Sequence, residues 1–199
     1  IEAIGKKVDA AGIWGTDKPA SWPTAIVPGA TAAGNVVTAG ADLTVSVAEL
    51  GQKLAEDGFA ASGFITAPGF NWRLVGLRAS DGHPIYSPSV TAGQPSALYG
   101  LRLDEVRNGS WGVTDPATDL IGLDWSKFVV GIRQDITFKM LDQAVITDDT
   151  GKVIFNAPQQ DSKIMRVVFR VGFQVANPLT RVNPDGASRY PAAVLTAAP

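Results

Sequence analysis

The segment from 163 to 177, KIMRVVFRVGFQVAN, constrains the fold of this chain more than any other. Apolar side chains occupy every second position from Met165 to Val175, and the positions between them include Arg166 and Arg170. This alternation is typical of a β-strand with one apolar and one polar face. At about 3.3 Å per residue, a strand of about thirteen residues would extend roughly 40 Å, well beyond the usual length. We therefore expect a long scaffold strand whose apolar face packs on a core.

A second alternating segment begins at Lys127. Apolar side chains from Phe128 to Met140 share one face, and the opposite face includes Arg133 and Lys139. This pattern predicts one long bent strand or two short ones. Further on, the sequence ITDDTGKVIF is typical of a hairpin turn between two strands.

The clearest predicted helix spans 46–57. Ser46 and Glu49 have the spacing of a capping box, and Gly58 is placed as the stop signal after the last apolar position. The first residues, from 1 to 8, have the spacing of a helix tail that ends near Gly12 and Gly15.

The remaining elements are shorter. We expect a strand at 62–67, a second helix at 71–79 and an extended segment at 96–103. The proline-containing segment 16–35 is read as a loop with a short extended piece at 24–27, and the Ala- and Pro-rich tail after Pro178 as irregular.

Composition favours a mixed α+β fold of one large or two small domains. The 199 residues are 45% hydrophobic and 18% charged, which is enough for a real core. Gly (21) and Pro (13) are frequent for a helical bundle but ordinary for strands and loops. No segment has the length and apolar character of a membrane span or a signal peptide, so we expect a soluble chain without membrane association. There is no cysteine, which excludes disulfides and fits a reducing compartment.

The charge pattern argues against a nucleic-acid-binding role. The formal net charge is -2, and the longest basic cluster is Lys6-Lys7. Tight binding to phosphates requires Lys and Arg concentrated on one face.

The sequence predicts no catalytic, cofactor-binding or metal site. His83 is the only histidine, and it follows a tight Asp-Gly turn, so a loop histidine is favoured over a general base. One His and no Cys cannot supply the usual nitrogen and sulfur ligands of a metal ion. An all-oxygen Ca²⁺ site stays open, although Asp148 and Asp149 lack the spacing of a Ca²⁺ loop and fit a strand-joining turn better. Neither of the glycine-rich phosphate-binding motifs nor the GxSxG motif occurs.

Arg166 and Arg170 are the candidate contact residues. They lie on the polar face of the predicted long strand, where they could bind anions. An ion pair across strands or between subunits is the more ordinary use of such residues.

The order of these elements resembles the major capsid protein of tailed phages, the Hong Kong 97 type fold that is shared with encapsulin shells. Four segments carry the resemblance, which covers roughly residues 10 to 182. They are GTDKPASWP at 15–23, FITAPGFNWRLVGLRASDGHPIY at 64–86 after the helix at 46–57, LIGLDWSKFVVGIRQDITFKM at 120–140, and DSKIMRVVFRVGFQVANPLTRV at 161–182.

The resemblance implies a shell protein of two lobes. A peripheral lobe would comprise 1–42 and 131–199, with the end of a spine helix and the long strands, and an axial lobe would comprise 43–130. The family's N-terminal arm, extended loop and most of the spine helix would precede residue 1. A covalent crosslink between subunits is not implied, because its lysine would lie upstream.

The resemblance also implies a function without catalysis or cofactors. Copies would assemble into pentamers and hexamers that enclose double-stranded DNA in an icosahedral capsid, with Arg166 and Arg170 as possible subunit contacts. The expected location is the virion, and the host cytoplasm during assembly, with a scaffolding or maturation protease as possible partners. A mildly acidic chain can enclose DNA without trapping it. Two alternatives stay open, an encapsulin-like nanocompartment and a non-catalytic binding domain.

Overall fold

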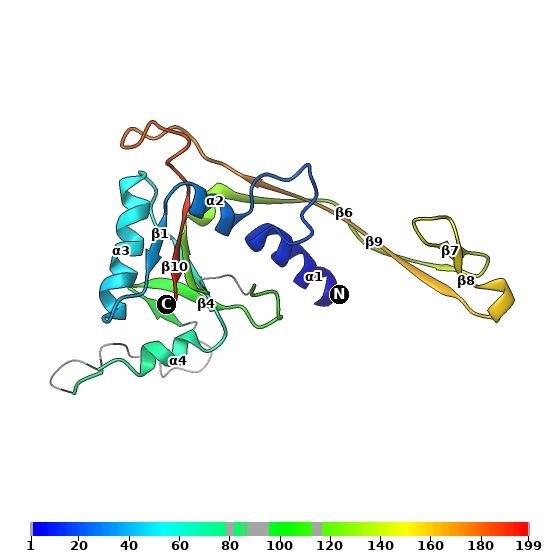
Figure 1. Cartoon of the computed structure of the whole chain (residues 1–199), viewed down its shortest axis with the longest axis horizontal. Helices are drawn as coiled ribbons and strands as arrows, with labels where there is room; N and C mark the ends of the chain where they lie inside the picture. Colours follow the sequence, from blue (N-terminus) through cyan, green and yellow to red (C-terminus); the bar gives the residue numbers. More distant parts are fainter. Residues whose placement is uncertain (1, 79–81, 85, 87–95, 113–116, 199) are drawn as a thin grey trace. The chain divides into compact units, whose positions relative to one another are not determined.

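The computed structural model of the chain contains helices and mixed sheets, which confirms the predicted α+β class. The chain forms two compact units (Figure 1). Ile1–Val129 with Gln174–Pro199 is called the sheet lobe here, and Val130–Phe173 the ribbon lobe. The structure describes residues 2–78, 82–84, 86, 96–112 and 117–198.

A mixed six-stranded sheet forms the centre of the sheet lobe. In sheet order its strands are β1 (Val36–Thr38), β10 (Ala192–Thr196), β5 (Thr118–Leu123), β2 (Gly63–Thr66), β4 (Leu101–Glu105) and β3 (Ala97–Leu98). β5 is antiparallel to both neighbours, and its Ile121 lies opposite Val194 of β10 and Ile65 of β2. β1 and β4 are parallel to β10 and β2, and β3 is antiparallel to β4. The free edges of the sheet are therefore β1 and β3.

The three central strands, β2, β5 and β10, are buried at every residue. The predicted strand at 62–67 is confirmed by β2. β5 was not predicted, and the prediction of an irregular tail after Pro178 is wrong because the tail returns to form β10. A strand covered on both faces has no polar alternation, so its sequence lacks the two-residue period that reveals a half-buried strand.

The helix predicted at 46–57 is confirmed as α3 (Leu43–Glu56), but it begins three residues earlier. Its N-cap is Asp42, whose carboxylate accepts a hydrogen bond from the Thr44 amide at 2.9 Å. The predicted capping box at Ser46 is wrong. The Ser46 hydroxyl instead accepts from the Gly40 amide at 2.9 Å and donates to the Asp42 carbonyl, so it ties the preceding loop to the first turn.

Two glycines determine where helix α3 ends and how closely it packs on the sheet. Gly58 follows its last turn with φ +80°, a left-handed conformation that confirms the predicted stop. Leu50, fully buried, lies directly over Gly122 of β5, where an added Cβ would overlap the leucine side chain. The absence of a side chain at Gly122 thus lets the helix approach the sheet closely.

A second helix packs on the other side of β10 (Figure 1). This helix, α2 (Ile26–Ala32), lies in the segment that was predicted as a loop with an extended piece at 24–27, and that prediction is wrong. Pro28 is in the first turn, where an amide has no acceptor within the helix, so proline is tolerated there. Gly29 faces the ring of Tyr190, and an added Cβ would overlap that ring.

The first residues of the chain form a helix, as predicted. Helix α1 (Glu2–Asp9) continues into a π-helix, η1 (Ala10–Trp14), and Gly15 ends it with φ +81°. Trp14 makes an edge-to-face contact with Trp111, with ring centroids 5.2 Å apart, and this contact ties the helix to the sheet lobe.

The segment after β2 forms a short helix and a hairpin. The predicted helix at 71–79 is α4 (Phe70–Val75), which ends earlier, at the Gly76 cap. The predicted extended segment at 96–103 is confirmed as the β3–β4 hairpin, which turns at Tyr99 and Gly100.

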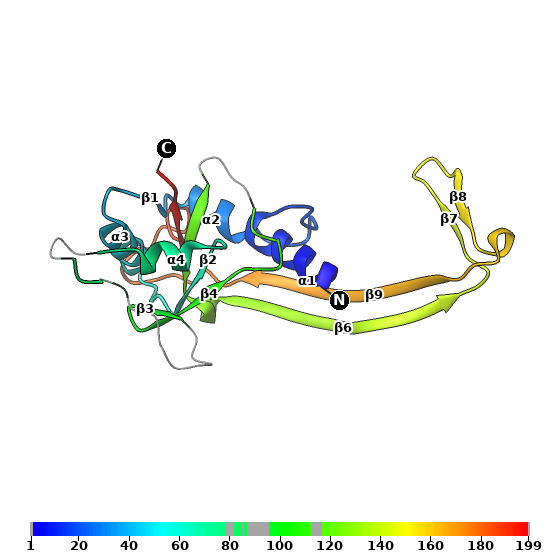
Figure 2. The same ribbon diagram turned by 90° about the horizontal axis from the view of Figure 1, so that it is seen from below.

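Two long strands dominate the ribbon lobe. They are β6 (Phe128–Leu141), a single strand of 14 residues, and β9 (Ile164–Val175), the predicted long strand. They pair in a two-stranded sheet and run antiparallel (Figure 2). A small antiparallel hairpin, β7 (Val145–Thr147) and β8 (Val153–Asn156), followed by the short helix η3 (Pro158–Gln160), joins them. The hairpin prediction is thereby confirmed.

Candidate subunit-contact surface

The two long strands carry a largely apolar face. The Ala176 amide donates to the Lys127 carbonyl at 2.7 Å, and Gly172 lies against the Gly131 carbonyl. Because residues opposite each other in an antiparallel pair share a face, even positions of β6 lie beside odd positions of β9. The resulting apolar ribbon face consists of Val130, Ile132, Ile136, Phe138, Met140, Met165, Val167, Phe169, Val171 and Phe173. Gln134 is the polar residue on this face.

Much of the apolar ribbon face is exposed. Ile132 is 62% exposed, Phe138 59% and Met165 58%. The predicted strand is correct, but the prediction that its apolar face packs on a core of the same chain is wrong along this stretch. Among the residues of the ribbon lobe, all of which the structure describes, only Ala157 is buried. Contiguous exposed apolar surface of this kind is typical of sites at which a protein contacts another molecule.

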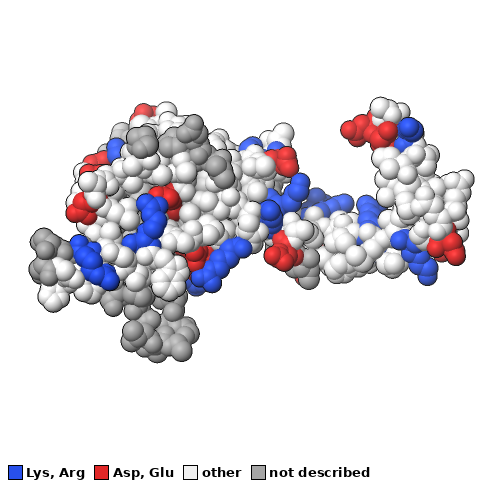
Figure 3. Space-filling model, turned by 60° about the horizontal axis from the view of Figure 1, so that its bottom comes forward, with Lys and Arg blue, Asp and Glu red and all other residues white. Residues whose placement is uncertain are grey.

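The opposite face of the ribbon is basic. Arg166 and Arg170 are exposed on β9, where the alternation predicted them, and Arg133 and Lys139 are exposed on the matching positions of β6. Asp135 is the acidic residue on this face, which leaves an excess of positive charge. Figure 3 shows Lys and Arg side chains along the narrow part of the ribbon. The face can therefore bind carboxylates or other anions.

The hairpin at the end of the ribbon is a structured turn with exposed apolar sides. The Asp148 carboxylate accepts hydrogen bonds from the Thr150 hydroxyl at 2.6 Å and from the amides of Thr150 and Lys152, both at 2.9 Å. These hydrogen bonds hold the pKa of Asp148 below its usual value, and the bond from the Thr150 hydroxyl has the largest effect. Its role as a strand-joining turn is thus confirmed. Four apolar side chains on the hairpin are more than two-fifths exposed, namely Val145, Ile146, Val153 and Ile154.

In the sheet lobe, a buried carboxylate fixes the segment that returns from β9 to β10. Asp57 is 4% exposed, and its oxygens accept from the Asn35 side chain at 2.6 Å, the Asn183 side chain at 2.8 Å and the Tyr190 amide at 3.0 Å. The Thr180 hydroxyl donates to the Asp57 carbonyl at 2.8 Å. Residues far apart in sequence thereby converge on one side chain.

A buried arginine completes this network. Arg189 is 5% exposed and donates to the Asn177 side chain at 3.0 Å and to the Asn183 carbonyl at 2.9 Å. Asn183 therefore links the buried anion Asp57 to the buried cation Arg189. Since buried charges are tolerated only when they are fully hydrogen-bonded, the network gives the return segment one defined conformation.

That conformation exposes the outer part of the return segment. Residues 178–182, called the anchored loop here, lie between the bonded side chains of Asn177 and Asn183. Leu179 is 75% exposed and Val182 66%, and Arg181 between them is also exposed.

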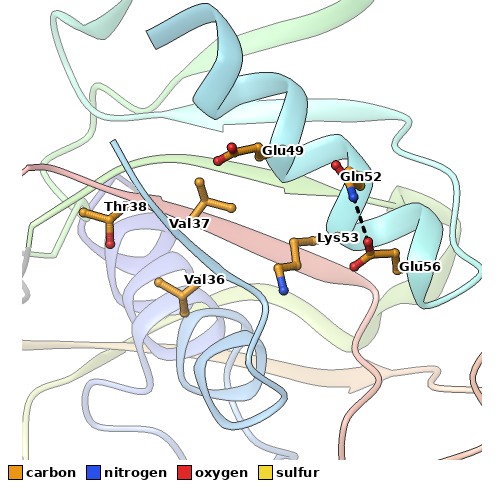
Figure 4. A pocket seen from close by; sticks show the side chains of 7 residues that line it. All are labelled: Val36, Val37, Thr38, Glu49, Gln52, Lys53 and Glu56. Carbon is orange, nitrogen blue, oxygen red and sulfur yellow. Dashed lines mark hydrogen bonds between the residues drawn. The ribbon is translucent and has the colours of Figure 1, made fainter. Parts of the chain in front are cut away.

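A groove runs beside the free edge of the sheet (Figure 4). It has a volume of about 390 Å³ and lies between β1 and helix α3. Glu49 and Glu56 are exposed, and Gln52 donates to Glu56 at 2.8 Å. The groove, called the edge groove here, is lined by Val36, Val37, Thr38, Glu49, Gln52, Lys53 and Glu56.

The described residues provide no cluster of metal ligands. Within that part of the chain, no three His, Asp or Glu side chains are grouped as metal ligands, and no helix is long and apolar enough to cross a membrane. His83 is exposed in a loop near the bridge between Arg78 and Pro84. Asp81 of the predicted Asp-Gly turn lies outside the described residues.

An exposed apolar ribbon beside a sheet lobe with its own core is a feature of proteins that assemble with other molecules. Residues 1–179 match the model of the phage capsid family. The chain belongs to the phage capsid family, whose members are structural proteins of the virion. A search of curated proteins found no match.

Solved structures agree with this assignment. A chain from Microbacterium phage Oxtober96 is 33% identical, with a TM-score of 0.81, over 98% of this chain. A chain from Mycobacterium phage Bobi is 29% identical, with a TM-score of 0.79, over 100% of this chain. The capsid of an empty GTA particle, computed with C5 symmetry, shares the fold at 16% identity, with a TM-score of 0.54 over 97% of this chain and 62% of that one.

These findings confirm the resemblance to the tailed-phage major capsid proteins of the Hong Kong 97 type. This chain spans 62% of the length of the chains from phages Oxtober96 and Bobi.

Proposed function

We propose that this chain is a shell subunit that self-assembles with further copies into pentamers and hexamers of an icosahedral capsid. The observation that carries the proposal is the exposed apolar ribbon face in a member of the phage capsid family. A two-stranded ribbon without a core is marginally stable alone, so contacts with other copies would supply the missing burial.

The basic ribbon face supports a contact of a second kind. Arg166 and Arg170 are proposed to pair with carboxylates of a neighbouring subunit. Arginine suits this role because its planar guanidinium binds a carboxylate through two parallel hydrogen bonds.

We also propose that the shell subunit has the two lobes that the resemblance to capsid proteins implies. The peripheral lobe would comprise 1–42 and 131–199 and the axial lobe 43–130, so that the central sheet draws β1 and β10 from the peripheral segments. The compact units of the chain follow a different boundary, because β10 is built into the sheet and only Val130–Phe173 separates.

Enclosure of double-stranded DNA is proposed as containment without tight binding. A net charge of -2 gives no general attraction to phosphates. Assembly in the host cytoplasm, with a scaffolding or maturation protease as partners, belongs to the same proposal.

An encapsulin-like compartment is the second candidate, and a non-catalytic binding domain the third. The solved structures named above come from phages and a GTA particle, which favours the viral shell.

Negative-stain imaging after size-exclusion separation tests the proposal. Closed shells, pentamers or hexamers of the chain are the expected result. A chain that stays monomeric at every concentration, with its sheet lobe folded, would contradict self-assembly and favour the binding domain.

A further inference from the structure

The geometry points to a contact in which the anchored loop of one copy (178–182) binds the edge groove of a neighbouring copy. This inference rests on the proposed function, because it requires copies to assemble, and it adds a second contact that is separate from the ribbon.

The anchored loop has the properties of an inserting element. Its two apolar side chains, Leu179 at 75% and Val182 at 66%, are among the most exposed in the described part of the chain. The loop is nevertheless fixed at both ends, by Asn177 on one side and by Thr180 and Asn183 on the other.

A buried charged network is a costly way to shape a surface loop. The fixed conformation lowers the entropy that the loop would lose on binding, which favours a role in recognition. The network therefore gives a physical reason why an exposed Leu and an exposed Val are held in one place.

The edge groove has the properties of a receiving element. β1 is the terminal strand of the sheet, so the outer side of Val36–Thr38 presents backbone groups to a neighbouring molecule. Val36 is half-buried and provides apolar surface in the groove, whereas Val37 is 6% exposed and belongs to the core.

Opposite charge supports the loop as the occupant of the groove. Glu49, Glu56 and Lys53 line the groove, which leaves an excess of negative charge there, and Arg181 is exposed in the middle of the loop. With Leu179 and Val182 against Val36, Arg181 would pair with Glu49 of the other copy. Because loop and groove are different patches, such a contact runs head to tail and can close a ring.

Charge reversal with rescue tests this contact. Arg181→Glu and Glu49→Arg are compared with the combined variant and with Arg102→Glu, which reverses another exposed arginine of the sheet lobe. Particle yield is measured by light scattering and imaging, and folding by thermal melting. We expect each single reversal to lower the yield at least tenfold at an unchanged melting temperature, the combined variant to restore it, and Arg102→Glu to leave it unchanged.

A crosslinking experiment gives an independent measurement. The chain has no cysteine, so Arg181→Cys and Glu49→Cys each introduce a single thiol. When the two proteins are mixed and oxidised, we expect mixed disulfide dimers to form faster than between Arg102→Cys and Glu49→Cys.

Each outcome decides a separate point. If the unaltered chain assembles and the single reversals assemble equally well, or the combined variant is not rescued and no preferential disulfide forms, the loop–groove contact is overturned while the proposed function stands. If the unaltered chain forms no particle or ring, the proposed function fails, and this inference with it.

Discussion

The sheet lobe and the ribbon lobe use similar apolar residues in opposite ways. In the sheet lobe, Leu50, Leu120 and Leu195 are fully buried between helix and strand. In the ribbon lobe, Ile132 and Phe138 are more than half exposed. The sheet lobe therefore supplies its own stability, whereas the ribbon lobe carries its apolar surface outward.

This difference separates the apolar surface that is buried by folding from the apolar surface that is left for the proposed assembly. Burial of a large apolar side chain stabilises by about 1.5–3 kcal/mol, whether the covering atoms come from the same chain or from another. If a second copy supplies that burial, as proposed, the order of the ribbon is linked to assembly.

The largest effect is expected in the core of the sheet lobe. Leu50→Ala removes a fully buried side chain that packs on β5 and leaves a cavity. We expect the free energy of unfolding to fall by about 4 kcal/mol. Urea unfolding followed by tryptophan fluorescence measures this, with the exposed Val45→Ala on the same helix as the control. Equal effects of the two changes would contradict the described packing of α3.

The hydrogen-bond network around Asp57 is expected to contribute slightly less to the free energy of unfolding than Leu50 does. Asp57→Ala leaves the donors of Asn35, Asn183 and Tyr190 without their acceptor. We expect a loss of about 3 kcal/mol of unfolding free energy. Hydrogen exchange should show the loss first in residues 177–190. Full protection of that segment in the variant would show that the network does not fix it.

A substitution on the ribbon should affect assembly and leave the stability of the free chain nearly unchanged. Ile132→Asp places a charge on the apolar ribbon face, at a side chain that is 62% exposed. We expect the unfolding free energy of the unassembled chain to change by at most about 0.5 kcal/mol, while particle formation is lost.

Val129→Asp is the matched control for this ribbon variant. It makes the same change on the opposite face of β6, at 55% exposure. Particles from Ile132→Asp at normal yield would remove the apolar ribbon face from the assembly contacts.

The smallest expected effect is a local pH dependence of the β7–β8 turn. The folded-state pKa of Asp148 lies below its usual value of 3.8. Its contribution is therefore fully present above pH 3.8 and is lost as the pH falls through the lower folded-state value. Amide chemical shifts of Thr150 and Lys152 should move in that range, and the same shifts in Asp148→Asn should not. A pH response that persists in Asp148→Asn would assign it to another group.

The sequence predicts amphipathic elements well and doubly buried elements poorly. β6 and β9 were predictable because polar and apolar residues alternate along them, and that alternation also placed Arg166 and Arg170 on the exposed face. β10 was not predictable, since AAVLT is buried on both faces and has no polar alternation. α2 was missed because three prolines nearby outweighed its helical residues.

The contact surface was predictable only in part. Alternation identifies which face of the ribbon is apolar, but it does not show whether the same chain or another covers it. The Asp57 network joins residues up to 155 positions apart, so no local pattern indicates it. The anchored loop and the edge groove depend on this long-range folding and became visible only in three dimensions.

Hydrogen–deuterium exchange of the chain before and after assembly tests the central claim most directly. The account predicts that amides of β5 and β10 are protected in both states and that amides of β6 and β9 gain protection on assembly. A ribbon that is equally protected in the unassembled chain, or that exchanges as fast in particles as in free chains, would contradict the claim that its apolar face is covered by neighbouring subunits.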